Sequence, residues 1–311
     1  MKFKYIKLRF IKPKYKKILV LDNATFYRNK FSRKKNIYNI LYTRYEEFYF
    51  FILFKSILLF FLSPKNLTIL QLYIIETIKW LNPKFIISFT DYDYFFFTLK
   101  EYFPEKKVII FQGSYRSHIT LNDQKKKLEK INKLNKRKLK IDFFFIYGKA
   151  LKKYYQRLLK TNFIFCGSVR NNLIRKKFKK DKNSLVIISH FTTHLDIYRT
   201  RYHKVINSLK IIEKYCKLNN LKLVVFGRAK TKFQSEEIEF YDDVFDNNYK
   251  YFPSLIKKFP DRESLHYENS EKYNFFLNFT STLGYELATK GKKVAFVYGS
   301  LIQKPNRQLR F

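Results

Sequence analysis

Cysteine, glycine, proline and tryptophan are scarce in this sequence, and the scarcity of cysteine excludes two classes of site. The chain has two cysteines, seven glycines, seven prolines and one tryptophan among 311 residues. Cys166 and Cys216 are too few and too far apart to predict a disulfide framework or a zinc site. We therefore expect a protein of a reducing compartment, the cytoplasm.

Long hydrophobic runs are missing as well. The first apolar run, ILVL at residues 18–21, is too short for the core of a signal peptide, so we expect no export. The segment FYFFILFKSILLFFLS, residues 48–63, falls short of the roughly 20 residues that span a bilayer, and it carries Lys55. It is predicted to be a helix that is either buried in a core or touches a membrane surface, and burial is the commoner state.

Acidic residues are few, which leaves a strongly basic chain. Lys and Arg number 64 against 25 Asp and Glu, for a formal net charge of +39, and 20% of the residues are aromatic. This charge suits a polyanionic partner: nucleic acid, an anionic membrane surface or a phosphorylated substrate. The excess of Lys, Asn, Ile, Phe and Tyr also fits A/T-rich codons, so a selected basic surface and a composition bias both stay open.

The most basic stretch, KKKLEKINKLNKRKLK at residues 125–140, predicts an amphipathic helix. Its apolar residues Leu128, Ile131 and Leu134 have helical spacing. The basic face of such a helix is either exposed to solvent or in contact with anionic lipid. The chain has no RNA- or DNA-binding motif, so we expect no specific nucleic-acid partner.

Short, continuous apolar runs predict parallel strands that helices cover on both faces, because strands exposed on one face would alternate. The helical stretches between them supply the crossovers. The predicted strands are residues 17–22, 84–90, 107–112, 142–147, 162–167, 184–190, 221–226, 273–279 and 293–298.

The length suits two domains, each with its own core. The polar, basic run VRNNLIRKKFKKDKN at residues 169–183 predicts a linker between a domain of residues 1–168 and one of residues 184–311. The predicted fold class is α/β, with two domains whose parallel sheets face a central cleft.

Most of the glycines fall where predicted strands end: Gly113, Gly148, Gly167, Gly227 and Gly299. In open parallel sheets, ligands bind outside the carboxyl ends of the strands, where the backbone turns tightly. The positions of these glycines thus favour a binding cleft, although an ordinary turn after a strand explains any one of them.

The segment NFTSTLGYELATKG, residues 278–291, predicts an anion-binding helix terminus. Ser281 and Thr282 precede a helix as N-cap residues, and Gly291 ends it. Free backbone N–H groups and the positive end of the helix dipole would then suit a diphosphate. Gly284 would let phosphates approach the backbone. A plainly capped helix explains these residues equally well.

The stretch STLGYELATKG, followed by an apolar strand, resembles the C-terminal domain of GT-B glycosyltransferases, in particular the bacterial surface-carbohydrate or O-antigen biosynthesis proteins. Other stretches are similar in the same order: residues 88–117, FCGSVRNN at 165–172, and LVVFGRAK at 223–230 with the following EIEFYDDVF. The resemblance covers about residues 17–300. It implies two Rossmann-like domains of GT-B type.

The family implies an enzyme of surface polysaccharide (O-antigen, lipopolysaccharide) biosynthesis. It would transfer a sugar from a nucleotide-sugar donor to a glycan or lipid-linked acceptor at the cytoplasmic face of the membrane, without a bound metal or other cofactor. The implied donor contacts are Arg228, Ser281, Thr282, Gly284 and Glu286, the last being placed in the first turn of its helix to accept hydrogen bonds from sugar hydroxyls. The implied acceptor-side residues are Gln112, Gly113 and Arg116.

A general base should follow a strand that ends at the cleft. Asp91 is the first candidate, before Asp93 and Asp22, and His190 is a further acid/base or phosphate contact. For each aspartate, a helix cap or turn residue is the commoner explanation. His190 with His194 lacks the third ligand that a metal site needs.

The chain departs from the family on the acceptor side. It has Gly113 and Ser114 where Asn-Gly is common, and Asp91-Tyr92-Asp93 where an Asp-Asn pair is common. It also ends soon after its last predicted strand, where a GT-B enzyme usually adds a helix, so the resemblance leaves activity open. A polyol-phosphate transferase of the same fold, or a non-catalytic basic protein that binds nucleic acid or an anionic membrane, are the alternatives.

Overall fold

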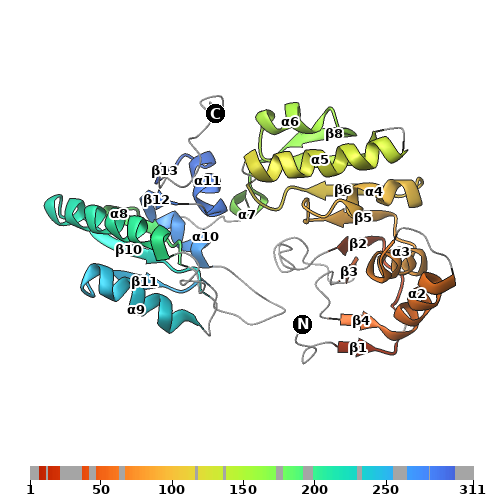
Figure 1. Ribbon diagram of the computed structural model, residues 1–311, viewed down its shortest axis with the longest axis horizontal. Coiled ribbons are helices and arrows are strands. Elements are labelled where there is room, and N and C mark those ends of the chain that lie inside the picture. The colour runs from red at the N-terminus through yellow and green to blue at the C-terminus, as the bar shows by residue number, and fades with distance from the viewer. Residues whose placement is uncertain are drawn as a thin grey trace. The chain divides into compact units, whose positions relative to one another are not determined.

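The chain divides into two compact units, each with its own parallel sheet (Figure 1). The computed structural model describes residues 7–11, 13–21, 37–41, 47–62, 67–115, 118–135, 138–172, 178–191, 199–229, 233–254, 265–279 and 281–297. The N-terminal unit is residues 1–166 and the C-terminal unit is residues 167–311. The predicted fold class, two α/β domains with parallel sheets, is confirmed.

The N-terminal unit contains a six-stranded sheet in the order β3-β2-β5-β6-β7-β8, in which every pair is parallel. Its strands are β2 (Ile18–Leu21), β3 (Tyr38–Leu41), β5 (Phe85–Ser88), β6 (Lys107–Phe111), β7 (Leu139–Ile146) and β8 (Leu159–Phe165). Beside it, β1 (Lys7–Arg9) pairs with β4 (Glu47–Tyr49). Apolar side chains such as Leu19, Ile86 and Phe144 form the core with the helices.

The helices of this unit are α2 (Phe50–Leu62), α3 (Ile69–Leu81), α4 (Phe95–Tyr102), α5 (His118–Asn135) and α6 (Lys149–Tyr155). Helix α3 shows why the chain turns where it does. Thr68 and Gln71 form a capping box at its start, and Asn82 ends it in the left-handed conformation, at φ 44°.

Helix α2 is not a core helix, which corrects the commoner reading of residues 48–63. It packs on α3, and only Ile52 and Ser56 are buried along its length. Most of its phenylalanines and leucines are exposed. None of the helices that the structure describes is long and apolar enough to cross a bilayer.

The basic stretch at residues 125–140 is only partly helical. Helix α5 begins at His118, before the predicted start, and ends at Asn135, whereas Leu139 already belongs to β7. Leu128 is buried and Ile131 packs against the core, as the helical spacing predicted.

The C-terminal unit contains a five-stranded parallel sheet in the order β11-β10-β9-β12-β13. The strands are β9 (Asp181–Ile188), β10 (Lys222–Phe226), β11 (Lys250–Phe252), β12 (Tyr273–Asn278) and β13 (Lys293–Phe296). The helices are α7 (Val169–Asn172), α8 (Arg199–Leu218), α9 (Gln234–Phe245), α10 (Leu265–Asn269), the 3₁₀ turn η4 (Ser270–Lys272) and α11 (Thr282–Thr289). Residues 169–183, the predicted linker, thus carry α7 and the first residues of β9.

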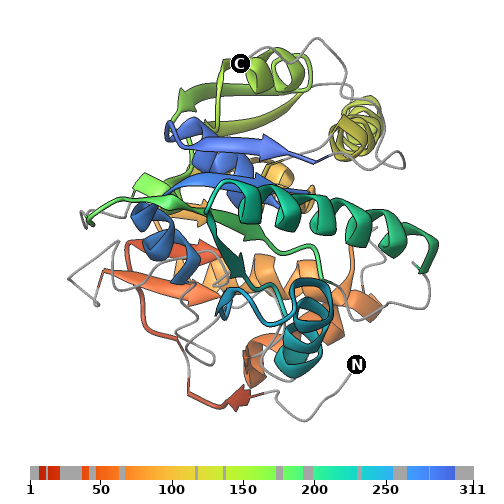
Figure 2. The same ribbon diagram turned by 90° about the vertical axis from the view of Figure 1, so that its left-hand side faces the viewer.

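Helices cover this second sheet on both faces. Alternate strand residues such as Ile187 and Val225 pack against α8 and α9, which lie side by side in Figure 2. Their neighbours Val186 and Val224 pack against α10 and α11. This two-sided burial explains why the strands read as continuous apolar runs.

All nine predicted strands are present, with ends that differ by a few residues. Four of the described strands, β1, β3, β4 and β11, were not predicted, because each has only three or four residues and is partly polar.

Candidate functional site

The candidate site lies at the carboxyl edge of the C-terminal sheet, where its strand order reverses. From β9 the chain moves outward to β10 and β11, then returns to place β12 on the other side of β9. The segments that follow β9 and β12 therefore leave the sheet on the two sides of a switch point in strand order, and open α/β sheets bind ligands in the crevice expected at such a point. The rings of His190 and Phe279, one from each segment, stack with centroids 5.9 Å apart.

Helix α11 starts at this edge and has the cap that the sequence predicted. The Ser281 hydroxyl accepts a hydrogen bond from Leu283 N at 3.3 Å, and Thr282 is the first helical residue. Both side chains are partly exposed. Gly291, at φ 80°, follows the other end of the helix. The positive end of the α11 dipole is thus presented at the crevice.

Gly284 is explained by packing against Asn278. Asn278 is fully buried, donates from Nδ2 to Ser281 O at 3.1 Å and accepts from Ser281 N at 3.1 Å. A Cβ at position 284 would lie 2.2 Å from Asn278 Cγ. The glycine therefore makes room for an amide that fixes the turn between β12 and α11.

Glu237 organises the neighbouring strand ends, although the sequence analysis did not select it. Its fully buried carboxylate, on α9, accepts from Arg228 N at 2.8 Å and from Ala229 N at 2.7 Å. It also accepts from the hydroxyls of Tyr251, at 2.7 Å, and Ser189. The Glu237 carboxylate thus forms hydrogen bonds with three segments: the residue after β9, the residues after β10 and the middle of β11.

This arrangement fixes the backbone of Arg228 while its side chain is exposed. Gly227, just before it, has no room for a side chain, because a Cβ there would lie 2.0 Å from Tyr251 Oη. The backbone of Arg228 is therefore fixed at the carboxyl edge of the sheet, where a phosphate contact by its side chain was predicted.

The two described histidines at this edge are electrically neutral near neutral pH. Burial, with a further contribution from the Arg228 charge, lowers the pKa of His190 below its usual range. Burial also lowers the pKa of His266, whose ring stacks on Phe226 at 4.7 Å and whose Nε2 lies 2.6 Å from Gly227 O. That contact requires Nε2 to carry the proton, and it leaves Nδ1 buried without a hydrogen-bond partner. His194 lies outside the described residues.

Glu286 is the fifth residue of α11, beyond the first turn in which it was placed. Its side chain is fully buried, and Oε2 accepts from Tyr267 Oη at 2.6 Å. Its backbone carbonyl accepts from Asn171 Nδ2 of α7 at 2.8 Å. In the structure Glu286 therefore joins α11 to α7 and α10, and its contact with a donor stays a prediction.

In the N-terminal unit, Asp91 and Gly113 are brought together. The fully buried Asp91 carboxylate accepts from Gly113 N at 3.0 Å, joining the ends of β5 and β6. Gln112 bridges to the end of β7 by accepting from Tyr147 N at 2.9 Å, and it donates to Ser114 O at 3.0 Å. These contacts explain why the residues follow strand ends, while their catalytic and acceptor roles stay predictions.

Asp93 is more accessible than Asp91. It accepts from Phe95 N at 3.1 Å at the start of α4, and burial raises the pKa of its carboxyl. Arg116 and Asp22 lie outside the described residues. Among the side chains that are placed, no three His, Cys, Asp or Glu groups gather closely enough to hold a metal ion.

A family model described as "putative O-antigen biosynthesis protein" matches residues 109–309, more than half of the chain. This range includes the stretches at 165–172, 223–230 and 281–291 that carried the resemblance. None of the curated proteins matches the chain significantly.

Three solved structures illustrate the distant likenesses of the whole chain. HepE (Alr3699) of Anabaena, in complex with UDP, is 12% identical with a TM-score of 0.44, over 89% of this chain and 79% of that one. MurG of Acinetobacter baumannii is 11% identical, with a TM-score of 0.44 over 93% and 80%. A glycosyltransferase from Rickettsia africae is 11% identical, with a TM-score of 0.46 over 91% and 79%.

Proposed function

Because the chain belongs to the O-antigen biosynthesis family whose model matches it, we propose that it is a glycosyltransferase of surface polysaccharide biosynthesis. It transfers a sugar from a nucleotide-sugar donor to a glycan or lipid-linked acceptor, at the cytoplasmic face of the membrane. Family membership supports the place in O-antigen biosynthesis, and the site in the C-terminal unit supports the donor.

The observation that carries the donor assignment is the meeting of two positive groups at one strand edge. The N-terminus of α11 and the exposed Arg228 both lie at the carboxyl edge of the sheet, on the strands β12 and β10 that flank β9. The positive end of a helix dipole and a guanidinium both favour binding of a diphosphate. Ser281 and Thr282 add partly exposed hydroxyls at the same place.

Transfer breaks the bond between the anomeric carbon and the diphosphate oxygen, while the acceptor hydroxyl bonds to that carbon and loses its proton. The nucleoside diphosphate leaves with the electron pair, so negative charge develops on it. We assign its stabilisation to the α11 N-terminus and Arg228, with no bound metal required. The proton goes to a base, for which Asp91, Asp93 and His190 are the candidates.

Glu237 is a positioning residue in this scheme. Its hydrogen bonds from Arg228 N and Ala229 N hold the turn that presents Arg228. A site held in advance does not reorganise when charge develops on the leaving group, which makes each contact more effective.

Calorimetric titration with nucleoside diphosphates and nucleotide sugars tests the donor site. The parent should bind one nucleotide selectively, with and without EDTA, and Arg228→Gln should weaken binding by about 1.5–3 kcal/mol, the usual contribution of a charged hydrogen bond. Lys222→Gln is the matched control, because Lys222 is an exposed cation at the opposite end of the same strand. Equal binding by all three proteins would refute the assignment of Arg228, and absence of binding by the parent would refute the donor site.

A further inference from the structure

One side of helix α2 presents an apolar face to solvent. Its members, Phe51, Phe54, Leu58, Phe61 and Leu62, recur at helical spacing and are between 45% and 78% exposed. Soluble proteins rarely leave so many large apolar side chains together in water without a binding role. We call these five residues the apolar face of α2.

The charged residue of this helix, Lys55, is 59% exposed and lies at helical spacing from Phe51 and Leu58. Lys55 pairs through Nζ with Glu76 of α3, at 2.8 Å, and Lys79 of α3 pairs with the same carboxylate at 2.7 Å. Although burial alone would raise it, these two ion pairs hold the pKa of Glu76 below its usual range. Helix α2 is therefore anchored to α3 by its cation and turns its apolar face outward.

The apolar surface continues into the N-terminal strand. Strand β1 pairs with β4, and β4 ends directly before α2 begins. The ring of Phe10 packs on the ring of Phe50 with centroids 5.1 Å apart. Phe10 and Ile11 are 61% and 82% exposed, and the exposed cations Lys7 and Arg9, the second paired with Glu47, precede them in the chain. Apolar and cationic side chains thus lie beside each other at this edge.

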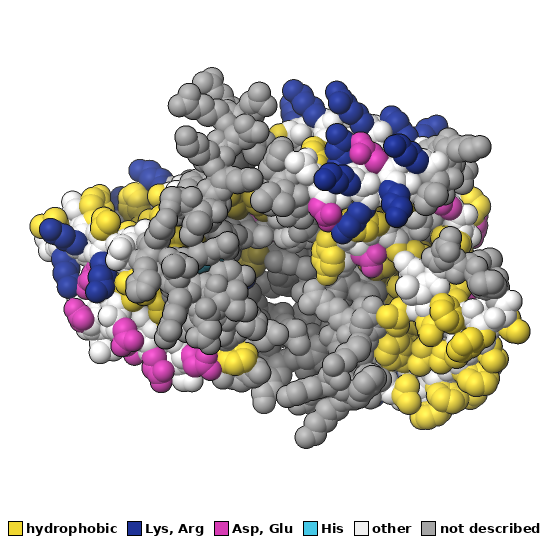
Figure 3. Space-filling view, in the orientation of Figure 1, with side chains coloured by type: hydrophobic (Ala, Val, Ile, Leu, Met, Phe, Trp, Pro, Cys, Tyr) yellow, Lys and Arg dark blue, Asp and Glu magenta, His cyan; other side chains and the backbone are white. Residues whose placement is uncertain are grey.

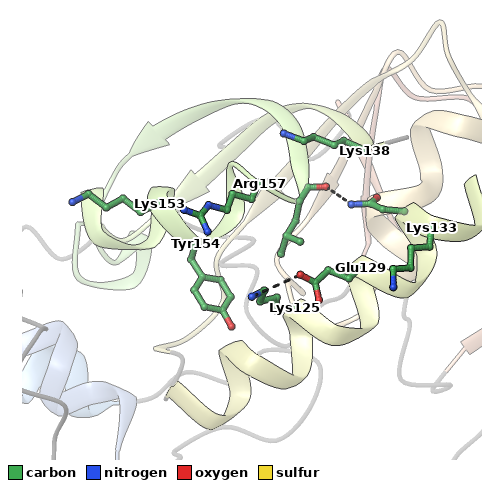
Figure 4. Close-up of a pocket in the computed structure, with 9 residues that line it drawn as sticks. Lys125, Glu129, Lys133, Lys138, Lys153, Tyr154 and Arg157 are labelled. Carbon is green, nitrogen blue, oxygen red and sulfur yellow. Dashed lines mark hydrogen bonds and ion pairs between the residues drawn. The ribbon is translucent and has the colours of Figure 1, made fainter. Parts of the chain in front are cut away.

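A basic cavity lies in the same unit, between α5 and the α6–β8 region. It has a volume of about 650 Å³ and is lined by the five cations Lys125, Lys133, Lys138, Lys153 and Arg157, against the single carboxylate of Glu129. Figure 4 shows these side chains around the hollow, with Lys125 paired to Glu129 at 3.7 Å. The excess of positive charge favours phosphate groups as occupants.

Both features are visible on one face of the N-terminal unit. Figure 3 shows the hydrophobic side chains gathered over α2 and the Lys and Arg side chains gathered over α5 and α6, all turned to the viewer. We propose that this face docks the protein on an anionic lipid bilayer: the apolar face of α2 enters the boundary between headgroups and acyl chains, and the basic cavity contacts lipid phosphates.

Geometry and charge favour a bilayer over other occupants. Helix α2 has 13 residues, about 20 Å of helix, which suits a helix lying in the interface and is too short to span the membrane. A second copy docked symmetrically through the same face would bring the two basic surfaces toward each other, which is electrostatically unfavourable. A bilayer accepts apolar side chains without a shaped partner, and its anionic headgroups complement the cations.

Co-sedimentation with vesicles of phosphatidylglycerol and phosphatidylcholine tests the docking face. The parent should bind these vesicles. The variant Phe54→Ser/Phe61→Ser should lower the partition coefficient by at least about 100-fold, because each side chain that no longer enters the bilayer costs about tenfold. Ile211→Ser/Leu218→Ser is the matched control, because these α8 residues are 69% and 75% exposed in the other unit. The control should bind as the parent does.

The cations are tested with the same vesicles and with pure phosphatidylcholine. Lys133→Gln/Lys153→Gln should weaken binding by about fivefold for each lysine, on the anionic vesicles alone. Lys210→Gln/Lys214→Gln, exposed cations of α8, is the control and should leave binding unchanged.

Three results would overturn the proposal. They are no vesicle binding by the parent, equal losses in the α2 and α8 apolar variants, or a dimer in analytical ultracentrifugation that Phe54→Ser/Phe61→Ser dissociates. Because no nucleotide is present in these experiments, their outcome is independent of the proposed donor site.

Discussion

Replacing Glu237 with Gln tests whether one buried carboxylate holds the candidate site together. The substitution keeps size and shape but replaces one acceptor oxygen by an N–H donor. The hydroxyls of Ser189 and Tyr251 can rotate to accept from the new amide, whereas a backbone N–H cannot. If the amide nitrogen takes the Oε2 position, Ala229 N, now 2.7 Å from that oxygen, faces a donor.

The expected loss follows from these contacts. A buried backbone donor without a partner costs about 1–3 kcal/mol, and the remaining bonds lose the strengthening that a charged acceptor gives. We expect Glu237→Gln to lower the free energy of unfolding of the C-terminal unit by about 2–4 kcal/mol. Because the same bonds fix Arg228, the variant should also bind nucleotide more weakly than the parent.

Urea unfolding followed by far-UV circular dichroism and by tryptophan fluorescence measures the loss. Trp80 is the single tryptophan of the chain and lies in the N-terminal unit, so its fluorescence reports on that unit. Glu239→Gln, an exposed glutamate on the same helix, is the control and should change the free energy by less than about 0.5 kcal/mol. If both variants unfold like the parent, the carboxylate does not hold the site as we reason.

Two further substitutions and a titration test other features of the site. Gly284→Ala should destabilise the protein by about 1–3 kcal/mol through the clash with Asn278, although alanine normally favours a helix. Gly148→Ala is the control and should not destabilise the protein, because no atom lies within 4 Å of the Cβ that it adds. Equal thermal unfolding of the two variants would contradict the packing role of Gly284. Burial lowers the pKa of His190 and of His266, so stability should fall as the pH drops below about 6.5, where the unfolded chain takes up more protons than the native state does. An NMR titration that places either midpoint at or above 6.5 would contradict this.

The strands and the capped helix could be predicted because they depend on local pattern. Continuous apolar runs located the strands, and Ser281 and Gly291 marked the ends of α11 before any contact was known. The residues that follow the strands were found for the same reason, since Asp91, Gly113 and Arg228 all lie at carboxyl ends.

The sequence did not reveal which side chains meet across the fold. Gly284 was interpreted as room for phosphate, but the nearest atoms belong to Asn278, six residues away on the preceding strand. Glu237 lies in an acidic run, EIEFYDDVF, in which the other acidic residues are more exposed, and only its contacts at the ends of β9 and β10 and with β11 distinguish it. Burial was predicted as the commoner state of helix α2, with membrane contact as the alternative, because composition does not say which face of a helix is covered.

The order of strands in the C-terminal sheet has a consequence for biosynthesis. Strand β9 is central, yet one of its two neighbours, β12, begins at Tyr273, long after β9 ends at Ile188. At roughly 5–20 residues per second, a ribosome needs several seconds to deliver that neighbour. Until then one edge of this central strand stays unpaired on the nascent chain, open to pairing with another polypeptide. The N-terminal sheet, which mostly adds strands in chain order, has no comparable waiting period once β5 has been made, so the last third of the chain is where slow translation would most expose this protein to aggregation.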